Sequence, residues 1–332
     1  MPALKNRMIM TRTPLRITFT GGGTDIGAYY RLNGPGAVVN AAINKYIYII
    51  VNKKFDNEIR VSYSKTEIVP HVEDIQHPSI REALRLLGID GGIEIVSISD
   101  IPSGGTGLGS SSSFLVGLLN ALHAWNGELV PPRQLAEEAV HIARDVLKEP
   151  GGKQDEYIAA YGGLQFMEFN KDESVAVRPV VMTEEARTSL RSHLQMLYTG
   201  KQRNSGVILK KQSDSAKPNL KSYDAMRDLA YRLYENLTKG NWQDTGRLLH
   251  ENWMLKKKLE GSISDKTIDG WYDRARKAGA LGGKIIGAGG GGFLLLFTPP
   301  SKQEAVRKAL PGLTVQEFEL EPQGSSIIYV GD

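Results

Sequence analysis

The stretch GIEIVSISDIPSGGTGLGSSSSFLVGLLNALHAW, Gly92 to Trp125, decides the fold class and points to a chemistry. Gly92 to Ser99 alternates apolar and polar residues, which predicts a strand, whereas Phe114 to Trp125 predicts an apolar helix. The loop between them, Pro102 to Ser113, carries four glycines and ends in four serines. Glycines let backbone N–H groups converge on an anion, and a helix N-terminus adds the positive end of its dipole. The loop therefore predicts an anion cradle, with an ordinary serine helix cap as the alternative.

The serine-rich end of this loop suits nucleotide phosphates and Mg²⁺, because serine hydroxyls can contact both. It is not a Walker A loop, since no Gly-Lys-Ser/Thr follows the glycines. A second segment, Gly287 to Gly292 (GAGGGG), formally matches G-x-G-x-x-G. Phe293 to Phe297 predicts a strand after it, whereas a dinucleotide site requires a helix there. We expect this segment to bring backbone close to a ligand, with a tight turn between strands as the alternative.

Two shorter segments place a carboxylate after glycine. Gly21 to Asp25 (GGGTD) follows a predicted strand, and Asp25 can either hold sugar hydroxyls or cap a helix. In Gly152 to Asp155 (GKQD), Asp155 can accept a hydroxyl proton, and Lys153 can stabilise the charge of a transferring phosphoryl group. On these residues alone, a capping role for Asp155 is favoured.

Composition describes an ordinary globular protein of 332 residues, 41% hydrophobic and 23% charged, for which about two domains are expected. The absence of cysteine excludes disulfides, thiol nucleophiles and Cys-based zinc or iron–sulfur sites. A net charge of +4 is too small for a nucleic-acid surface but suits anionic small substrates. No apolar run predicts a membrane span or a secretory signal, so we expect a cytoplasmic protein with neither membrane nor nucleic acid as partner.

Strands and helices mix in both halves without a strict βαβ rhythm, which predicts an α+β fold of two domains, 1–185 and 190–332. The boundary is expected in the polar stretch Val181 to Arg191. Further strands are predicted at Arg12 to Thr20, Ala37 to Asn52, Glu58 to Ser64, Leu164 to Asn170, Ser174 to Pro179, Leu194 to Tyr198, within Lys284 to Phe297, and near Ser325 to Val330. Further helices are predicted at Ile80 to Leu87, Arg133 to Leu147, Glu156 to Tyr161, Tyr223 to Gly240, Trp242 to Lys258, Ile268 to Ala278 and Gln303 to Ala309.

Three of these segments, in this order, resemble those of the GHMP kinases: Pro14 to Asp25 (PLRITFTGGGTD), Pro102 to Ser113, and Gly287 to Gly292. Together they span most of the chain. Within the superfamily, PLRITFTGGGTD, GGKQDEYIAAYGG and YTGKQRNSGVIL are similar to the heptose-phosphate kinases, whose relatives include fucose kinases. The resemblance implies an N-terminal domain like ribosomal protein S5 domain 2, a ferredoxin-like C-terminal domain, and an active site in the cleft between them.

The resemblance also implies residue roles, with ATP and Mg²⁺ as cofactors. Asp155 matches the catalytic carboxylate and Arg16 the arginine that neutralises developing charge; Lys153 is the third catalytic candidate. The ATP phosphates are expected at Gly105, Gly107, Leu108, Gly109, Ser110, Ser111 and Ser112. Mg²⁺ is expected on Ser110 or Ser111. Many members carry a Mg²⁺-binding Glu where this chain has Ala143, so either Asp145 substitutes for it or water molecules hold the ion on that side.

The substrate side is expected to comprise Gly23, Thr24, Asp25, Gln154, Lys201, Arg203, Gly290 and Gly291. Lys201 and Arg203, with Arg12 behind them, are the candidates for a substrate phosphate, and an exposed loop with solvated charges is the alternative. The implied activity is transfer of the γ-phosphoryl group of ATP to the anomeric hydroxyl of a heptose 7-phosphate. A kinase for an unphosphorylated sugar such as fucose or mannose, and a non-catalytic nucleotide or sugar sensor, are the alternatives.

Overall fold

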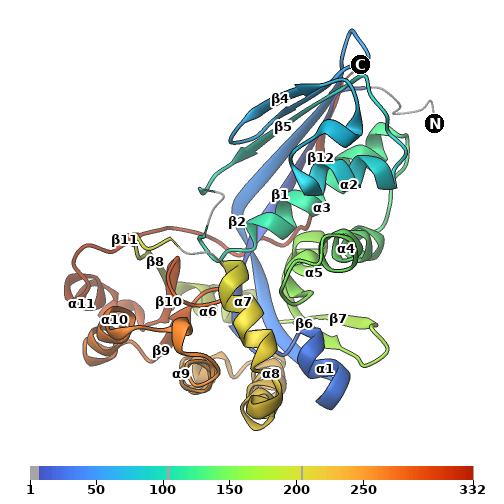
Figure 1. Cartoon of the computed structure of the whole chain (residues 1–332). Helices are drawn as coiled ribbons and strands as arrows, with labels where there is room; N and C mark the ends of the chain where they lie inside the picture. Colours follow the sequence, from blue (N-terminus) through green and yellow to red (C-terminus); the bar gives the residue numbers. More distant parts are fainter. Residues whose placement is uncertain (1–6, 103–104, 203–204, 332) are drawn as a thin grey trace.

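The computed structural model describes residues 7–102, 105–202 and 205–331, and its centre is a pair of long antiparallel strands (Figure 1). In this described part, eight strands form one sheet in the order β12-β1-β2-β5-β3-β4, with β6 paired to β2 and β7 paired to β6. The strands are β1 (Ile9–Thr20), β2 (Gly36–Lys53), β3 (Ile59–Ser62), β4 (Thr66–Val69), β5 (Ile93–Ser99), β6 (Leu164–Phe169), β7 (Val175–Pro179) and β12 (Ser326–Val330). β2 is long enough to pair with β6 through its first half and with β5 through its second.

Helices of the N-terminal unit cover this sheet and bring its loops to one edge. The apolar α3 packs across β1 and β2, and α5 contacts the same two strands. The helices are α1 (Gly27–Asn33), α2 (Pro78–Leu86), α3 (Ser110–Trp125), α4 (Pro132–Val140) and α5 (Gln154–Tyr161), with a π-helical turn at His141–Val146. Because nearly all of α3 is buried, its N-terminal turn is held rigidly next to β1.

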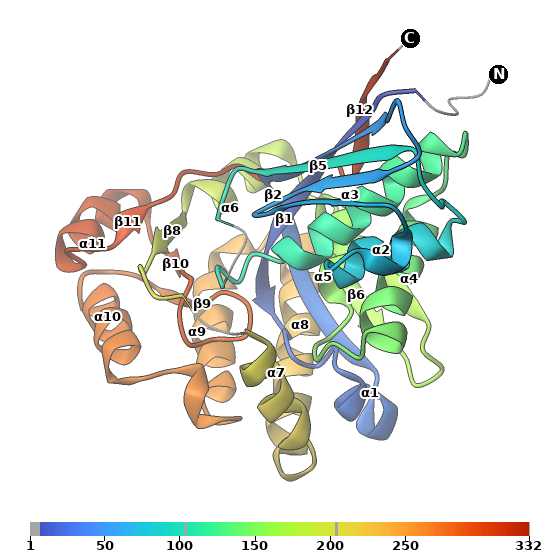
Figure 2. The same cartoon turned by 45° about the horizontal axis from the view of Figure 1, so that its top comes forward.

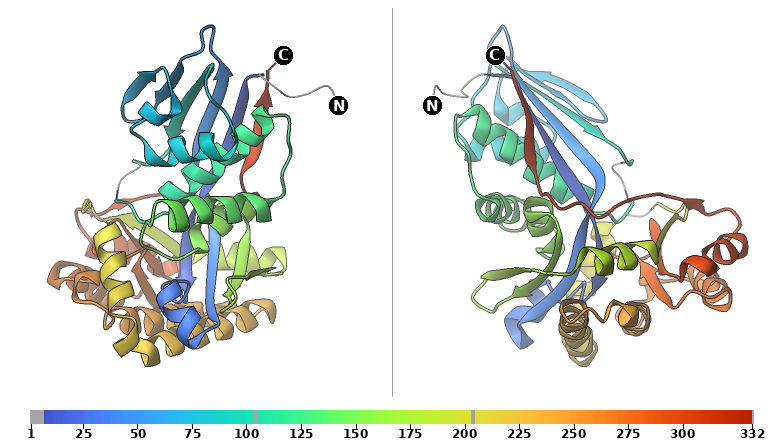
Figure 3. Two further views of the ribbon diagram at one scale, coloured as in Figure 1. Left: turned by 45° about the vertical axis from the view of Figure 1, so that its right-hand side comes forward. Right: turned by 180° about the vertical axis from the view of Figure 1, so that it is seen from behind.

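The C-terminal unit has its own sheet, with four antiparallel strands in the order β11-β8-β10-β9 among the described residues. Its elements are α6 (Glu184–Ser192), β8 (Leu194–Tyr198), α7 (Ser205–Asp214), α8 (Leu220–Thr238), α9 (Thr245–Lys256), α10 (Lys266–Lys277), β9 (Gly282–Ile285), β10 (Phe293–Phe297), α11 (Gln303–Ala309) and β11 (Thr314–Val315). This strand order, with helices between the first and second and the third and fourth strands, is the ferredoxin-like arrangement that the resemblance implied. α8 contacts β1 and β2, and α9 contacts β1, so the two units pack directly together (Figure 3).

The last strand departs from the expected boundary between the units. β12 pairs antiparallel with β1 at the edge of the N-terminal sheet, so the chain returns to the first unit after completing the second (Figure 2). Thr13 and Ser325 join the two strands through a hydroxyl–hydroxyl hydrogen bond of 2.8 Å. The final strand of the expected C-terminal unit, 190–332, therefore belongs to the sheet of the N-terminal unit.

Element types were predicted well and their ends less well. The helix expected at Phe114 begins at Ser110, so the serines form its first turn instead of preceding it. The helix expected at Arg133 to Leu147 changes from α to π at His141. Helices α1, α6 and α7 were not predicted. None of the helices in the described residues is long and apolar enough to span a membrane.

Candidate active site

A cavity of about 320 Å³ lies between the two units and contains most of the predicted site. Its walls come from the end of β1 and the glycines after it, the loop before α3, the segment before α5, and α7. The C-terminal unit closes it with Lys256, Lys284, Gly287 and Ala288. A concave site with convergent polar groups at a domain interface is where small ligands usually bind.

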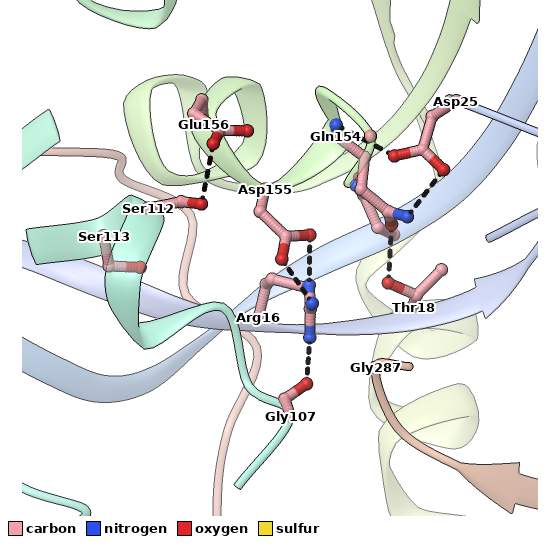
Figure 4. A network of polar contacts seen from close by, with 12 residues as sticks. Arg16, Thr18, Asp25, Gly107, Ser112, Ser113, Gln154, Asp155, Glu156 and Gly287 are labelled. Atoms are coloured by element: carbon pink, nitrogen blue, oxygen red, sulfur yellow. Dashed lines mark hydrogen bonds and ion pairs between the residues drawn. The ribbon is translucent and has the colours of Figure 1, made fainter. Parts of the chain in front are cut away.

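Arg16 and Asp155 both line this cavity, and their side chains point toward each other (Figure 4). Arg16 lies on β1, and Asp155 lies in the first turn of α5. The guanidinium binds the carboxylate in a bidentate way. Arg16 Nε donates to Asp155 Oδ1 at 2.8 Å, and Nη2 donates to Oδ2 at 2.5 Å. Arg16 Nη1 donates to the carbonyl oxygen of Gly107. This bidentate pair fixes the orientation of the carboxylate and ties it to the glycine loop.

The loop before α3 carries the left-handed backbone that its glycines allow. Gly105, Gly107 and Gly109 have φ of +69°, +81° and +79°. A side chain at Gly109 would also come within 3.4 Å of Asp155 Oδ2, so the loop packs closely against the central pair. Leu108 is buried, and its carbonyl oxygen accepts from the backbone N–H of Arg16. Leu108 thus anchors the loop, while its glycine neighbours face the cavity.

The serines of the first turn of α3 divide into different roles. Ser110, Ser111 and Ser112 line the cavity, and the Oγ of the buried Ser110 has no hydrogen-bond partner among the described residues. Ser112 Oγ donates to Glu156 Oε1 at 2.9 Å, and Ser113 Oγ donates to the carbonyl oxygen of Pro14 at 2.8 Å. Ser110 and Ser111 are therefore available to a ligand, whereas Ser112 and Ser113 hold the structure together. Ser103 and Gly104 lie outside the described residues.

Glu156 is a buried carboxylate that the sequence analysis did not single out (Figure 4). Its side chain is 1% exposed, and Oε1 also accepts from Arg144 Nη2 at 2.8 Å. Burial raises the pKa of Glu156 to about 7, although Arg144 opposes the rise. Arg144 also donates to the carbonyl oxygen of Gly152, which fixes the turn that leads into Asp155. Its position directly after Asp155 is the one signal that could have drawn attention to Glu156.

Asp25 meets Gln154 on the other side of the central pair. Asp25 Oδ2 accepts from the backbone N–H of Gln154 at 3.2 Å, and Oδ1 accepts from Gln154 Nε2 at 3.1 Å. Thr18 Oγ1 donates to Gln154 Oε1, and the N–H of Gly23 donates to Asp25 Oδ1. Asp25 thus accepts from the first backbone N–H of α5, as a helix cap does, and also lines the cavity; its contact with sugar hydroxyls stays a prediction. Thr24 is buried against Ala37 and lies outside the cavity wall.

Three charged residues of the predicted site also lie outside the cavity lining. Lys153 turns away and donates to Glu173, with its Nζ 5.2 Å from the centre of the Tyr30 ring. Asp145 is 63% exposed and pairs with His141 at 3.2 Å. Lys201 pairs with Asp265 at 2.7 Å, outside the residues that line the cavity. Arg203, the other candidate for a substrate phosphate, lies outside the described residues.

The third glycine segment supports the cavity more than it lines it. Gly287 and Ala288 face the cavity, whereas the N–H of Gly290 donates to the carbonyl oxygen of Ile263. Side chains at Gly291 and Gly292 would collide with the backbones of Lys201 and Thr106. The close approach predicted for this segment is therefore made mostly to other loops, including the one before α3.

These residues fit the phosphates of a nucleotide. The unpartnered Ser110 hydroxyl stands at the N-terminus of a 16-residue helix, beside glycines that leave backbone exposed to the cavity. For Mg²⁺, the described residues offer no cluster of three or more His, Asp or Glu side chains. Mg²⁺ commonly binds through phosphates, waters and one or two protein ligands, so Ser110 and Ser111 suit it. Asp145 is not brought to these serines, because it lies outside the cavity lining and pairs with His141.

Comparison with known proteins identifies the family of the chain. Family models match residues 78–163 as "GHMP kinases N terminal domain" and residues 233–313 as "GHMP kinases C terminal". These two matches together cover half of the chain, so the protein belongs to the GHMP kinases. The protein is accordingly an ATP-dependent kinase.

Individual proteins similar to this chain are more specific than the family models. The chain is 30% identical to a D-glycero-alpha-D-manno-heptose 7-phosphate kinase of Campylobacter jejuni, over 96% of this chain and 98% of the relative. It is 26% identical to an L-fucokinase/L-fucose-1-P guanylyltransferase of Bacteroides fragilis, covering 92% of this chain but 36% of that longer protein. A solved D-glycero-D-manno-heptose 1-phosphate kinase of Bacteroides thetaiotaomicron superposes with a TM-score of 0.81 and 25% identity, covering 98% of this chain and all of that one.

Proposed function

We propose that this protein transfers the γ-phosphoryl group of ATP to the anomeric hydroxyl of a heptose 7-phosphate, giving a heptose 1,7-bisphosphate for nucleotide-activated heptose synthesis. The observation that carries the proposal is the Arg16–Asp155 pair, which lies between a phosphate-binding loop and a second polar wall containing Asp25. The names of the two heptose-kinase relatives support the sugar class. They differ in the position of the phosphate, so the experiment below tests both positions.

In this proposal Asp155 faces the acceptor hydroxyl and accepts its proton, or orients it, as the oxygen attacks the γ-phosphorus. Arg16 holds both carboxylate oxygens, so the attacking group meets a carboxylate of fixed direction. The transition state of phosphoryl transfer is loose, and positioning and electrostatics supply most of the acceleration. Asp25 and Gln154, which are hydrogen-bonded to each other and line the cavity, would bind the sugar hydroxyls.

The nucleotide phosphates would lie against the N-terminus of α3, with Ser110 and Ser111 as hydroxyl contacts. Mg²⁺, when bound with ATP, would neutralise charge on the phosphate oxygens, and the same two serines are its candidate protein ligands. Gly107 and Gly109 line the cavity next to the Arg16–Asp155 pair, so phosphates bound at this loop would lie beside that pair. This arrangement would bring the terminal phosphate next to Asp155.

A substrate panel tests the proposal. The protein is incubated with ATP, Mg²⁺ and one acceptor: heptose 7-phosphate, heptose 1-phosphate, heptose, fucose or mannose. ADP release gives kcat/KM, and phosphorus NMR identifies the position that is phosphorylated. We expect the highest kcat/KM with the 7-phosphate and a new phosphate on the anomeric carbon. Preference for fucose, mannose or free heptose would favour the kinase for unphosphorylated sugars, and no ADP with any acceptor would favour a sensor.

A further inference from the structure

Two lysines of the C-terminal unit lie in the wall of the active-site cavity, and the mechanism above uses neither. Lys284 lies on β9 and is 1% exposed; Lys256 is the last residue of α9 and is 3% exposed. Both line the cavity together with Gly287. Fully buried lysines are rare in proteins unless their charge is paired.

Lys284 lacks such pairing within the part of the chain that the structure describes. Its Nζ makes a long contact of 3.4 Å with the carbonyl oxygen of Phe19, and it forms no ion pair with any described carboxylate. Lys256 Nζ donates to the carbonyl oxygen of Gly287 at 2.8 Å. Burial, with Lys256 and Arg16 nearby, holds the pKa of Lys284 well below its usual value. An anion entering the cavity would supply the missing opposite charge.

The position of Lys284 indicates which anion this would be. Phe19 is three residues beyond Arg16 on β1, about 10 Å along a strand. Arg16 contacts the phosphate loop through Gly107, so Lys284 lies further along β1, away from that loop. A Cβ added to Gly22 would lie 3.9 Å from Lys284 Nζ and 3.5 Å from Gln154 Nε2. The ammonium group is therefore beside the Gln154–Asp25 wall, on the acceptor side of Asp155.

We propose that Lys284 and Lys256 bind the phosphate group that the acceptor sugar already carries. The cavity then has two anion sites, one for the nucleotide at α3 and one for the acceptor, with Asp155 between them. This inference rests on the proposed function in taking the acceptor to be a sugar phosphate. It replaces Lys201 as the expected phosphate ligand, because Lys201 is committed to Asp265 outside the cavity.

Binding calorimetry on the full chain without nucleotide tests the acceptor site directly. The probes are heptose 7-phosphate and the same heptose without phosphate, titrated into wild type and Lys284→Met. A charge-assisted contact to phosphate is worth about 10- to 100-fold in affinity. We expect wild type to prefer the phosphorylated sugar by at least that factor, and Lys284→Met to lose the preference while binding free heptose as before. Lys257→Met is the matched control, because Lys257 follows Lys256 and pairs with Asp269.

Two results would overturn the acceptor site. One is an equal loss of affinity for both sugars in Lys284→Met, which would indicate a structural role; the other is an unchanged preference for the phosphorylated sugar. The melting temperature separates folding from binding, because replacing an unpaired buried ammonium by methionine should leave it unchanged or raise it. ADP release measured in parallel separates the two proposals. A wild type that binds through Lys284 without releasing ADP would disprove the kinase reaction and leave the anion site standing.

Discussion

The two walls of the active-site cavity differ in how completely their charges are paired. On the N-terminal side, Arg16 is bound to Asp155 at both ends and to Gly107 at a third point. On the C-terminal side, Lys284 has a long contact to a backbone carbonyl oxygen and no carboxylate partner in the described residues. In the two proposals above, this difference separates a preorganised reaction centre from a binding wall whose charge the ligand would balance. Such a division is physically reasonable, because reacting groups gain from a fixed geometry, whereas a ligand site gains from unmatched charge.

We expect the largest loss of activity from a substitution on the N-terminal side of the cavity, where Arg16 and Asp155 are paired. Asp155→Asn keeps the shape of the side chain but removes its charge and its ability to accept a proton. We expect kcat to fall about 10³-fold, within the range for loss of a general base or a key electrostatic group. The dissociation constant of a non-hydrolysable ATP analogue should change less than about threefold, since the phosphate loop remains. Steady-state kinetics and calorimetry measure the two quantities.

Asp145→Asn is the control for this loss, because Asp145 is an exposed carboxylate paired with His141. It should change kcat by less than about twofold, as expected for a surface ion pair. A tenfold loss in Asp145→Asn would restore this residue as a metal ligand. Near-normal turnover in Asp155→Asn would remove the reaction centre from the proposed mechanism.

Two serines in the first turn of α3 allow a hydroxyl without a hydrogen-bond partner to be compared with one that has a partner. Ser110 Oγ has no partner in the described residues, so Ser110→Ala should raise the KM for ATP about tenfold and leave the melting temperature unchanged. Ser113 Oγ is bonded to the carbonyl oxygen of Pro14, so Ser113→Ala should lower the free energy of unfolding by about 1 kcal/mol and leave the KM unchanged. Thermal unfolding and ATP kinetics are measured on both variants, and each variant should change only one of the two quantities. The opposite assignment of the two effects would show that Ser110 is structural.

Glu156 makes the paired wall sensitive to pH. Its pKa is raised from the ordinary value of 4.5 to about 7 in the folded protein, chiefly by burial. The folded state therefore favours the protonated form, and the stability that this provides is present below about pH 4.5 and is lost as pH rises toward 7. Between pH 5 and 8, wild type should lose up to about 3 kcal/mol relative to Glu156→Gln, which cannot ionise. Denaturant unfolding of both proteins across this range measures the difference, and parallel curves would contradict it.

The loops of the site were predictable from the sequence, and their pairing was not. Gly105 to Ser113 combines glycine and serine at a strand-to-helix junction, which is a local signal. The contact of Arg16 with Asp155 joins residues 139 apart, so it came from the resemblance to a family and not from spacing. Lys284 carries no local signal at all, because GGKII predicts a strand whatever its lysine faces. Its role depends on a long-range contact, that of its Nζ with the carbonyl oxygen of Phe19 on β1 of the other unit.

Errors of side-chain direction have a simple geometric source. Successive helical residues are rotated by about 100°, so residues two apart point to nearly opposite sides. Lys153 and Asp155 enter α5 with this spacing, and the structure turns one to Glu173 and the other to Arg16. Arg144 and Asp145 are adjacent in the π-helical turn and also point apart, the first toward the cavity and the second to solvent. A prediction based on nearness in the sequence therefore places too many charged side chains in the site.

Lys153→Met is expected to have the smallest effect and tests that geometric argument. Lys153 Nζ donates to Glu173 Oε2 at 2.5 Å, away from the residues that line the cavity. The same contact helps to hold the pKa of Glu173 down to about 2, together with the Arg31 hydrogen bond that lowers it most. Because Glu173 is half-exposed and keeps Arg31, we expect a stability loss below about 1 kcal/mol and a change in kcat of less than about threefold. A 100-fold fall in kcat with unchanged melting temperature would mean that Lys153 rotates into the cavity when ATP binds, and the paired wall would then gain a second cation during the reaction.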